Sequence, residues 1–172
     1  LVPTRELCEQ VAEEFKKITK FTKINTLEVY GGVSINNQIR KVPSAHIIVA
    51  TPGRLCDLMD RRVIDLSTVK TAVLDEADRM LDMGFIKDVG YILKKTPKNR
   101  QTLMFSATIP RMIERLIEKH MHKPKVVKIK DQVDTKLLKQ YYYDLPTSQR
   151  FHLLVHLLKN EKSPHAIVFC AT

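Results

Sequence analysis

The sequence is poor in glycine, with five among 172 residues. Gly31, Gly32, Gly53, Gly84 and Gly90 are never followed by Lys and then Ser or Thr. The phosphate-binding loop GxxxxGK[ST] is therefore absent from this chain.

Cysteine is also scarce, and long apolar runs are missing. Cys8, Cys56 and Cys170 form no CxxC pair and have no zinc-ligand spacing. This usage predicts reduced thiols in a cytoplasmic protein. No apolar run approaches the length of a membrane span, and no signal peptide precedes the first helical pattern.

The chain carries an excess of positive charge, with a net charge of +10 and a pI of about 9.6. Such an excess favours a polyanionic partner such as nucleic acid, and a solvated basic surface without a ligand is the alternative. The basic residues are spread along the sequence, so charge alone does not localise a site.

Short apolar runs alternate with segments of helical periodicity. Strands are predicted at 24–30, 46–50, 71–75, 101–105 and 125–129. Helices are predicted at 6–19 and 53–60, over most of 76–95, and at 110–120. This alternation predicts an α/β fold with a parallel sheet flanked by helices, and continuous apolar strands are typical of strands buried on both faces.

The polar stretch 131–137 lacks periodicity and is predicted to be a linker. Beyond it, a strand at 138–145, a helix at 148–160 and a strand at 165–170 indicate the start of a second domain. The sequence has no initial Met, and both ends lie in strand-like segments. We therefore expect this chain to be a fragment of something longer.

Polar residues follow three of the predicted strands. Asp75, Glu76 and Asp78 directly follow one, and Thr51–Arg54 and Ser106–Thr108 follow two others. Ligands of parallel sheets bind at the carboxyl ends of the strands, so these residues form a candidate site. Neighbouring carboxylates there suit a magnesium ion, and capping of the next helix is the alternative for Asp75 and Asp78.

These residues, in this order, resemble the motifs of the DEAD-box ATP-dependent RNA helicases. The matches are Pro3-Thr4-Arg5-Glu6-Leu7 to motif Ia, Gly31-Gly32 to the glycine doublet, Thr51-Pro52-Gly53-Arg54 to motif Ib, Asp75-Glu76-Ala77-Asp78 to motif II, Ser106-Ala107-Thr108 to motif III, and Val168-Phe169-Cys170-Ala171-Thr172 to the beginning of motif IV. The resemblance implies RecA-like domains, with residues 1–130 as the C-terminal part of the first (ATP-binding) domain and 138–172 as the start of the second (helicase C-terminal) domain.

The resemblance also implies an enzyme that uses ATP and magnesium to clamp RNA and to unwind short duplexes locally. Asp75 is expected to hold magnesium through water, and Glu76 to orient or deprotonate the attacking water. Asp78 is expected to bond toward Ser106 and Thr108, which would couple hydrolysis to duplex separation.

RNA is the implied partner, bound through its backbone and therefore in a sequence-independent and salt-sensitive manner. The implied RNA-binding residues are Pro3, Thr4, Arg5, Gly31, Gly32, Thr51, Pro52, Gly53, Arg54 and Thr172.

Without the phosphate loop, the isolated chain is predicted to be inactive as an ATPase. Two other hypotheses remain open, an RNA-binding module that acts without nucleotide and a related helicase that acts on DNA. His152 and His156, one helical turn apart, have a spacing that zinc accepts, but no further ligand completes a site. Tyr141–Tyr143 has the composition of a base-stacking platform, but a packed strand explains it better.

Overall fold

The computed structural model describes residues 1–128, 139–161 and 165–170. The chain divides into two compact units, Leu1–Val126 and Val127–Thr172. The predicted linker at 131–137 lies outside the described residues, so the assignment of domains stays a prediction.

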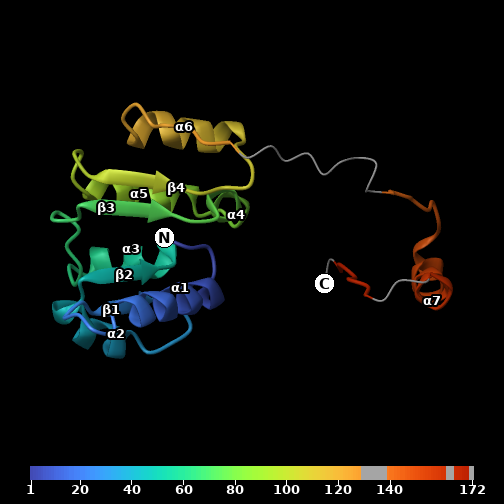
Figure 1. Cartoon of the computed structure of the whole chain (residues 1–172), viewed down its shortest axis with the longest axis horizontal. Coiled ribbons are helices and arrows are strands. Elements are labelled where there is room, and N and C mark those ends of the chain that lie inside the picture. The colour runs from blue at the N-terminus through green and yellow to red at the C-terminus, as the bar shows by residue number, and fades with distance from the viewer. Residues whose placement is uncertain (129–138, 162–164, 171–172) are drawn as a thin grey trace. The chain divides into compact units, whose positions relative to one another are not determined.

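The first unit contains two pairs of parallel strands (Figure 1). In one pair, β1 (Thr26–Val29) lies beside β2 (Ile47–Ala50). In the other, β3 (Thr71–Leu74) lies beside β4 (Gln101–Met104). These elements confirm four predicted strands, each within two residues of its predicted bounds.

Helices connect and cover the strands. They are α1 (Arg5–Ile18), α2 (Ile35–Lys41), α3 (Pro52–Asp60), α4 (Ala77–Asp82), α5 (Ile86–Lys95) and α6 (Arg111–His120), with a short 3-10 turn at Val42–Ser44. The sequence pattern predicted all of them except α2.

Three apolar clusters hold these elements together. Leu27 and Val29 of β1 pack with Leu58 of α3, while Cys8 and Ala12 of α1 pack against the other face of the β1–β2 pair. The third cluster joins β3 to the helices around it through Leu74, Met80, Val89, Leu93 and Ile113.

One face of the β3–β4 pair is only partly covered. Val73 is 38% exposed, Leu103 is 37% exposed and Phe105, just beyond β4, is 55% exposed. The expectation that these strands are buried on both faces is therefore wrong for this pair, because the helices that pack on it lie against the face that carries Leu74.

The second unit contains a 3-10 turn at Thr147–Gln149 and α7 (Arg150–Asn160), which confirms the predicted helix. The predicted strands are wrong in their described parts, since residues 125–128, 139–145 and 165–170 have no strand structure. An apolar segment becomes a strand only when it pairs with a neighbouring strand through backbone hydrogen bonds, and in the described part of the chain these segments pair with no strand. No helix in the described part of the chain is long and apolar enough to cross a membrane.

Candidate functional site

The polar residues that follow the strands share one edge of the first unit. The last paired residues are Val29 with Ala50 and Leu74 with Met104, so the following loops begin at matched positions. The segment Leu1–Val2 links the two strand pairs at this edge (Figure 1). Val2 N donates to Ala50 O at 3.0 Å, and Asp75 N donates to Leu1 O at 2.9 Å.

The two acids after β3 lie in a tight turn. Glu76 has a φ of +50°, a left-handed conformation that is uncommon for residues other than glycine. The turn is held because Glu76 N donates to Asp75 Oδ1 at 3.0 Å and Ala77 N donates to Phe105 O at 3.0 Å. Glu76, the N-cap residue of α4, makes no side-chain capping bond. Asp78 Oδ1, however, accepts from Arg79 N at 3.1 Å in the first turn, so a local capping bond is present at Asp78.

The side chain of Glu76 forms an ion pair with Arg79, with Oε2 accepting from Nη1 at 3.2 Å. Both side chains are about half exposed, at 41% for Glu76 and 58% for Arg79. Water screens a pair of this kind, so it contributes little to stability. Glu76 is thus free to exchange this partner for another at little cost.

Asp78 connects the loop after β3 to the loop after β4. Its Oδ2 accepts from Thr108 N at 2.8 Å and from Thr108 Oγ1 at 2.9 Å. Its backbone N donates to Ser106 Oγ at 3.1 Å, and Ser106 Oγ donates to Thr108 O at 2.7 Å. The three residues expected to bond to one another therefore do so, while their role in coupling stays a prediction.

The environment of Asp78 favours its charged form. Partial burial acts to raise the pKa of this carboxyl, but the hydrogen bonds from the Thr108 side chain and backbone, with those from Ser106 and Arg79, outweigh it. The pKa of Asp78 is consequently held below its ordinary value, and the carboxylate is ionised at neutral pH.

The described residues of this site offer few carboxylate ligands to a magnesium ion. Within the described residues, no group of three or more His, Cys, Asp and Glu side chains can hold a metal ion. Asp75 can supply one carboxylate, and magnesium commonly combines one or two carboxylates with water and substrate phosphate oxygens. The donor set therefore suits a metal that arrives with a nucleotide.

At the start of α1, Thr4 and Arg5 have different roles. Thr4 caps the helix, with its Oγ1 accepting from Leu7 N at 3.3 Å. Arg5 Nε donates to Glu9 Oε1 at 3.1 Å, and its guanidinium lies 5.1 Å from the centre of the Tyr30 ring. Pro3 is fully buried, so its side chain supports the loop and cannot reach a ligand.

The glycine doublet lies next to Arg5. Gly32 has a φ of +82°, which favours glycine, whereas Gly31 does not have a positive φ. A Cβ atom on Gly32 would lie 3.9 Å from Arg5 Nη1, so the guanidinium reaches this loop. Gly31 and Gly53 each have open space where a Cβ atom would lie.

The residues after β2 begin α3. Thr51 is the N-cap residue and its side chain forms no capping bond, while Pro52 at the first helical turn is buried. Arg54 Nη1 donates to Val33 O and to Gln38 Oε1, both at 3.2 Å. The guanidinium of Arg54 therefore ties α3 to the loop that follows the glycine doublet.

Sequence reasoning missed three residues of this site. Gln38 is only 6% exposed, and its Nε2 donates to Tyr30 O at 3.0 Å. Tyr30 OH donates to Glu9 Oε1 at 2.6 Å. The spacing of Arg5 and Glu9, four residues apart on a helix, is the one sequence signal that indicates such a contact.

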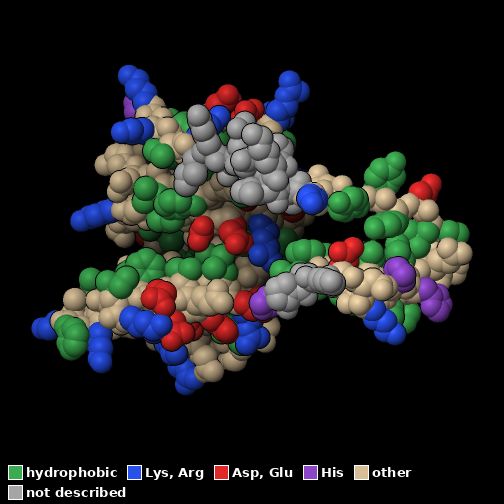
Figure 2. All heavy atoms as spheres, turned by 45° about the vertical axis from the view of Figure 1, so that its right-hand side comes forward, with side chains coloured by type: hydrophobic (Ala, Val, Ile, Leu, Met, Phe, Trp, Pro, Cys, Tyr) green, Lys and Arg blue, Asp and Glu red, His purple; other side chains and the backbone are tan. Residues whose placement is uncertain are grey.

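The remaining sequence candidates belong to the second unit. Thr172 lies outside the described residues. His156 in α7 contacts Asn160, and with His152 it belongs to no metal cluster in the described part of the second unit. Tyr141 and Tyr142 are exposed. On the face drawn in Figure 2, Lys and Arg side chains are dispersed over the surface, as their spread along the sequence indicates.

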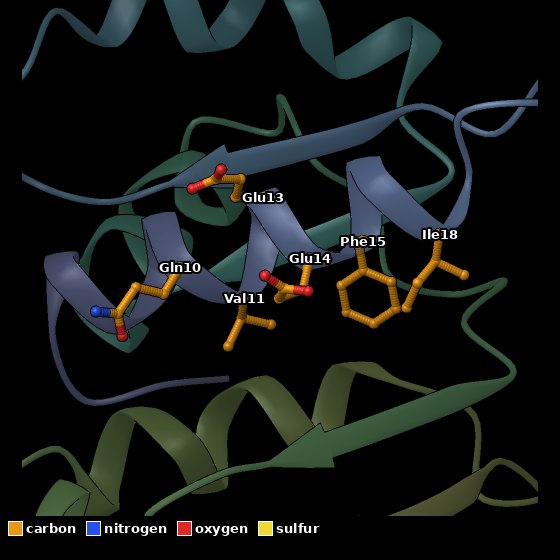
Figure 3. A pocket seen from close by; sticks show the side chains of 6 residues that line it. All are labelled: Gln10, Val11, Glu13, Glu14, Phe15 and Ile18. Carbon is orange, nitrogen blue, oxygen red and sulfur yellow. The ribbon is translucent and has the colours of Figure 1, made fainter.

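A separate hollow of about 430 Å³ lies along α1. Figure 3 shows Val11, Phe15 and Ile18 pointing to the same side of this helix. Phe15 is 36% exposed and Ile18 is 75% exposed, so this apolar face of α1 is incompletely covered. None of the predicted site residues lines this hollow.

Comparison of the sequence with known proteins finds similarity to one family of helicases. The sequence model of the DEAD/DEAH box helicases matches residues 1–116. The chain is 44% identical over 174 aligned residues to the DEAD-box ATP-dependent RNA helicase CshA of Bacillus cereus, covering all of this chain and 33% of the relative. It is 45% identical to the ATP-dependent RNA helicase CshA of Listeria monocytogenes, covering 34% of that protein.

Solved structures also resemble this chain in fold. A DEAD box protein from Methanococcus jannaschii matches 94% of this chain and 44% of its own, with a TM-score of 0.72 and 39% identity. A hypothetical ATP-dependent RNA helicase from Sulfolobus tokodaii matches 72% of this chain and 38% of its own, with a TM-score of 0.69 and 45% identity. These neighbours confirm the predicted α/β RecA-like fold with parallel strands flanked by helices.

The chain thus spans about a third of the length of the curated relatives it matches. The family model covers more than half of the chain and contains every motif from Pro3 to Thr108. This chain belongs to the DEAD/DEAH box helicase family.

Proposed function

We propose that this chain is part of an ATP-dependent RNA helicase that couples ATP binding and hydrolysis to RNA clamping and local duplex unwinding. The observation that carries the proposal is the set of hydrogen bonds in which Asp78 donates to Ser106 and accepts from Thr108. These bonds join the loop that holds the candidate magnesium ligand to the loop after the neighbouring strand. A structural change at the bound nucleotide would thereby be transmitted to the loop that carries Ser106 and Thr108.

Asp75 would help to hold magnesium, which would neutralise negative charge on the nucleotide during hydrolysis. Glu76 would orient or deprotonate the attacking water after its carboxylate leaves Arg79. In the isolated chain we propose that no ATP turnover takes place, because the 172 residues contain no phosphate loop to hold the nucleotide.

RNA would lie along the edge formed by the start of α1, the glycine doublet and the start of α3. Arg5 offers a cation, Gly31 and Gly32 admit a close backbone approach, and the N-terminus of α3 suits a phosphate. Arg54 would act here by holding the loop at Val33, since its guanidinium is already bonded within the protein. The cytoplasmic location predicted from cysteine usage is part of this proposal.

A chimera tests the enzymatic part. Residues 1–172 would replace the aligned segment of the Listeria monocytogenes CshA, which supplies the remaining length. We expect RNA-stimulated ATP hydrolysis by the chimera and its loss in Glu76→Gln and Asp75→Ala, while Asp60→Asn, a carboxylate of α3 outside the site, retains activity. The isolated chain should show no magnesium-dependent turnover.

The other hypotheses predict different results. A nucleotide-independent RNA-binding module would leave the chimera able to bind RNA but unable to hydrolyse ATP. A DNA helicase would be stimulated more by single-stranded DNA than by RNA of the same sequence. Turnover by the isolated chain would refute the proposed need for the phosphate loop.

A further inference from the structure

Arg5 is held on two sides by groups that lie outside the family motifs identified in the sequence. Glu9 accepts from Arg5 Nε at 3.1 Å, and the Tyr30 ring lies 5.1 Å from the guanidinium carbon. Tyr30 OH also donates to the same oxygen of Glu9, at 2.6 Å. The tyrosine therefore contacts Arg5 directly with its ring and indirectly through the carboxylate.

Arg5 bonds to Glu9 through Nε and reaches the glycine doublet with a terminal nitrogen, since Nη1 lies next to Gly32. Arg5 and Glu9 are about half exposed, at 49% and 45%, whereas Tyr30 is only 9% exposed. A buried ring thus gives a fixed support to a long side chain that would otherwise sample many rotamers in water.

The backbone of Tyr30 is fixed as well. Its carbonyl accepts from Gln38 Nε2 at 3.0 Å, and the side chain of Gln38 in turn accepts from Arg54. The position of the ring therefore follows the position of the loop that carries the glycine doublet. Tyr30 thus holds both Arg5 and the glycine-doublet loop in one arrangement.

We propose that Tyr30 is a positioning residue of the RNA-binding edge: its ring and its hydroxyl bond to Glu9 aim the terminal guanidinium nitrogens of Arg5 at the backbone of RNA lying along Gly31–Gly32. This inference rests on the proposed function. Tyr30 itself touches no phosphate, because its hydroxyl is already bonded to Glu9. A guanidinium that is aimed before binding loses less entropy when it pairs with a phosphate.

Tyr30→Phe tests the proposal, because it keeps the ring and removes only the hydroxyl bond to Glu9. The chain offers a matched control in Tyr91→Phe. Tyr91 OH donates to Asp60 Oδ1 at 2.8 Å, and Lys95 lies 5.6 Å from the centre of its ring, on α5 and away from the site. Both variants lose one tyrosine–carboxylate hydrogen bond beside a cation.

The measurement is the affinity of the 172-residue chain for a short fluorescent oligouridylate, by anisotropy, over a series of salt concentrations. Tyr30→Phe should weaken binding about threefold to fivefold, and Tyr91→Phe should leave it unchanged. Arg5→Ala should weaken binding and lower the slope of log K against log salt by about one. In the Arg5→Ala background, Tyr30→Phe should have no further effect.

The outcomes separate this inference from the proposed function. If Arg5→Ala weakens binding and Tyr30→Phe does not, the positioning role is wrong and the RNA-binding edge stands. If Tyr30→Phe weakens binding equally with and without Arg5, the tyrosine does not act through Arg5 and the inference is again wrong. If Arg5→Ala has no effect, Arg5 is no RNA contact and that part of the proposed function fails.

A second pair of variants keeps the test valid if Tyr30→Phe lowers the stability of the fold. Glu9→Gln weakens the bonds to both Tyr30 and Arg5 and removes one negative charge. Glu13→Gln removes the same charge one turn further along α1, where Glu13 pairs with Lys17. Glu9→Gln should bind RNA more weakly than Glu13→Gln, and equal affinities would overturn the positioning role.

Discussion

Replacing Thr108 with Val tests the hydrogen bonds between the loops that follow β3 and β4. Valine keeps the branched shape and the backbone bond from Thr108 N to Asp78 Oδ2, but it removes the hydroxyl bond of 2.9 Å. A hydrogen bond to a charged group contributes about 1.5–3 kcal/mol when buried. Because Thr108 is exposed and water can replace its hydroxyl, we expect a loss of about 1 kcal/mol.

The loss should depend on pH, with a sign fixed by the direction of the shift. The folded-state pKa of Asp78 lies below its ordinary value, mainly because its bonds to Thr108 overcome the opposing effect of partial burial. The stabilisation is therefore present above the unfolded pKa of about 3.9 and is lost as pH falls through the folded value. Wild type and Thr108→Val should differ in stability at pH 7 and converge at low pH.

Urea unfolding followed by far-ultraviolet circular dichroism measures both effects. Thr68→Val, at an exposed turn before β3, is the control for the general cost of exchanging hydroxyl for methyl. If Thr108→Val unfolds at the same urea concentration as Thr68→Val at pH 7, the bond to Asp78 adds no stability. If the difference between wild type and Thr108→Val persists unchanged at about pH 3, the ionised carboxylate is not its source.

Two further substitutions test the loop beside Arg5. Gln38→Leu should lower the free energy of unfolding, measured by urea titration, by about 1–3 kcal/mol. The reason is that it removes a bonding partner from Tyr30 O and from Arg54 Nη1. The control Asn36→Leu, on the exposed side of α2, should have little effect. Gly32→Ala should cost about 1 kcal/mol in the same assay, because an L-residue is disfavoured at φ +82° although its Cβ would meet no atom closer than 3.9 Å. Gly31→Ala, at a position without a positive φ, should be nearly neutral, and an equal loss at both glycines would contradict this explanation.

The four strands of the first unit were predictable because each is a short apolar run followed by polar or turn residues. The helix α2 was not, because Ile35–Lys41 has only two apolar residues among polar ones and forms under tertiary contacts such as those of Gln38. The strands expected at 125–129, 138–145 and 165–170 failed in their described parts for the converse reason. These segments are rich in residues that favour strands, but a segment forms a strand only where a neighbouring strand pairs with it.

The site shows the same division between local and long-range information. The contact of Asp78 with Thr108, 30 residues away, was expected from the resemblance to the helicase motifs and is present. The bonds of Arg54 to Val33 and Gln38 were not expected, because no local pattern indicates which carbonyl or amide a guanidinium will meet. The sequence motifs thus identify the site residues, whereas only the fold shows which of them already form bonds within the protein.

Under the proposed function, the segment Leu1–Val2 gives the nucleotide and RNA edges a short physical link. Its backbone bonds to β2 at Ala50 and to the acid turn at Asp75. Arg5 follows only three residues after Val2, at the first turn of α1. A displacement of Asp75 would therefore reach Arg5 through one backbone hydrogen bond, from Asp75 N to Leu1 O, and a short stretch of chain that contains the buried Pro3, whose ring restricts it. The bonds of Asp78 to Thr108 carry the same displacement to the other side of β3, so a change at the acids would move both flanking loops together.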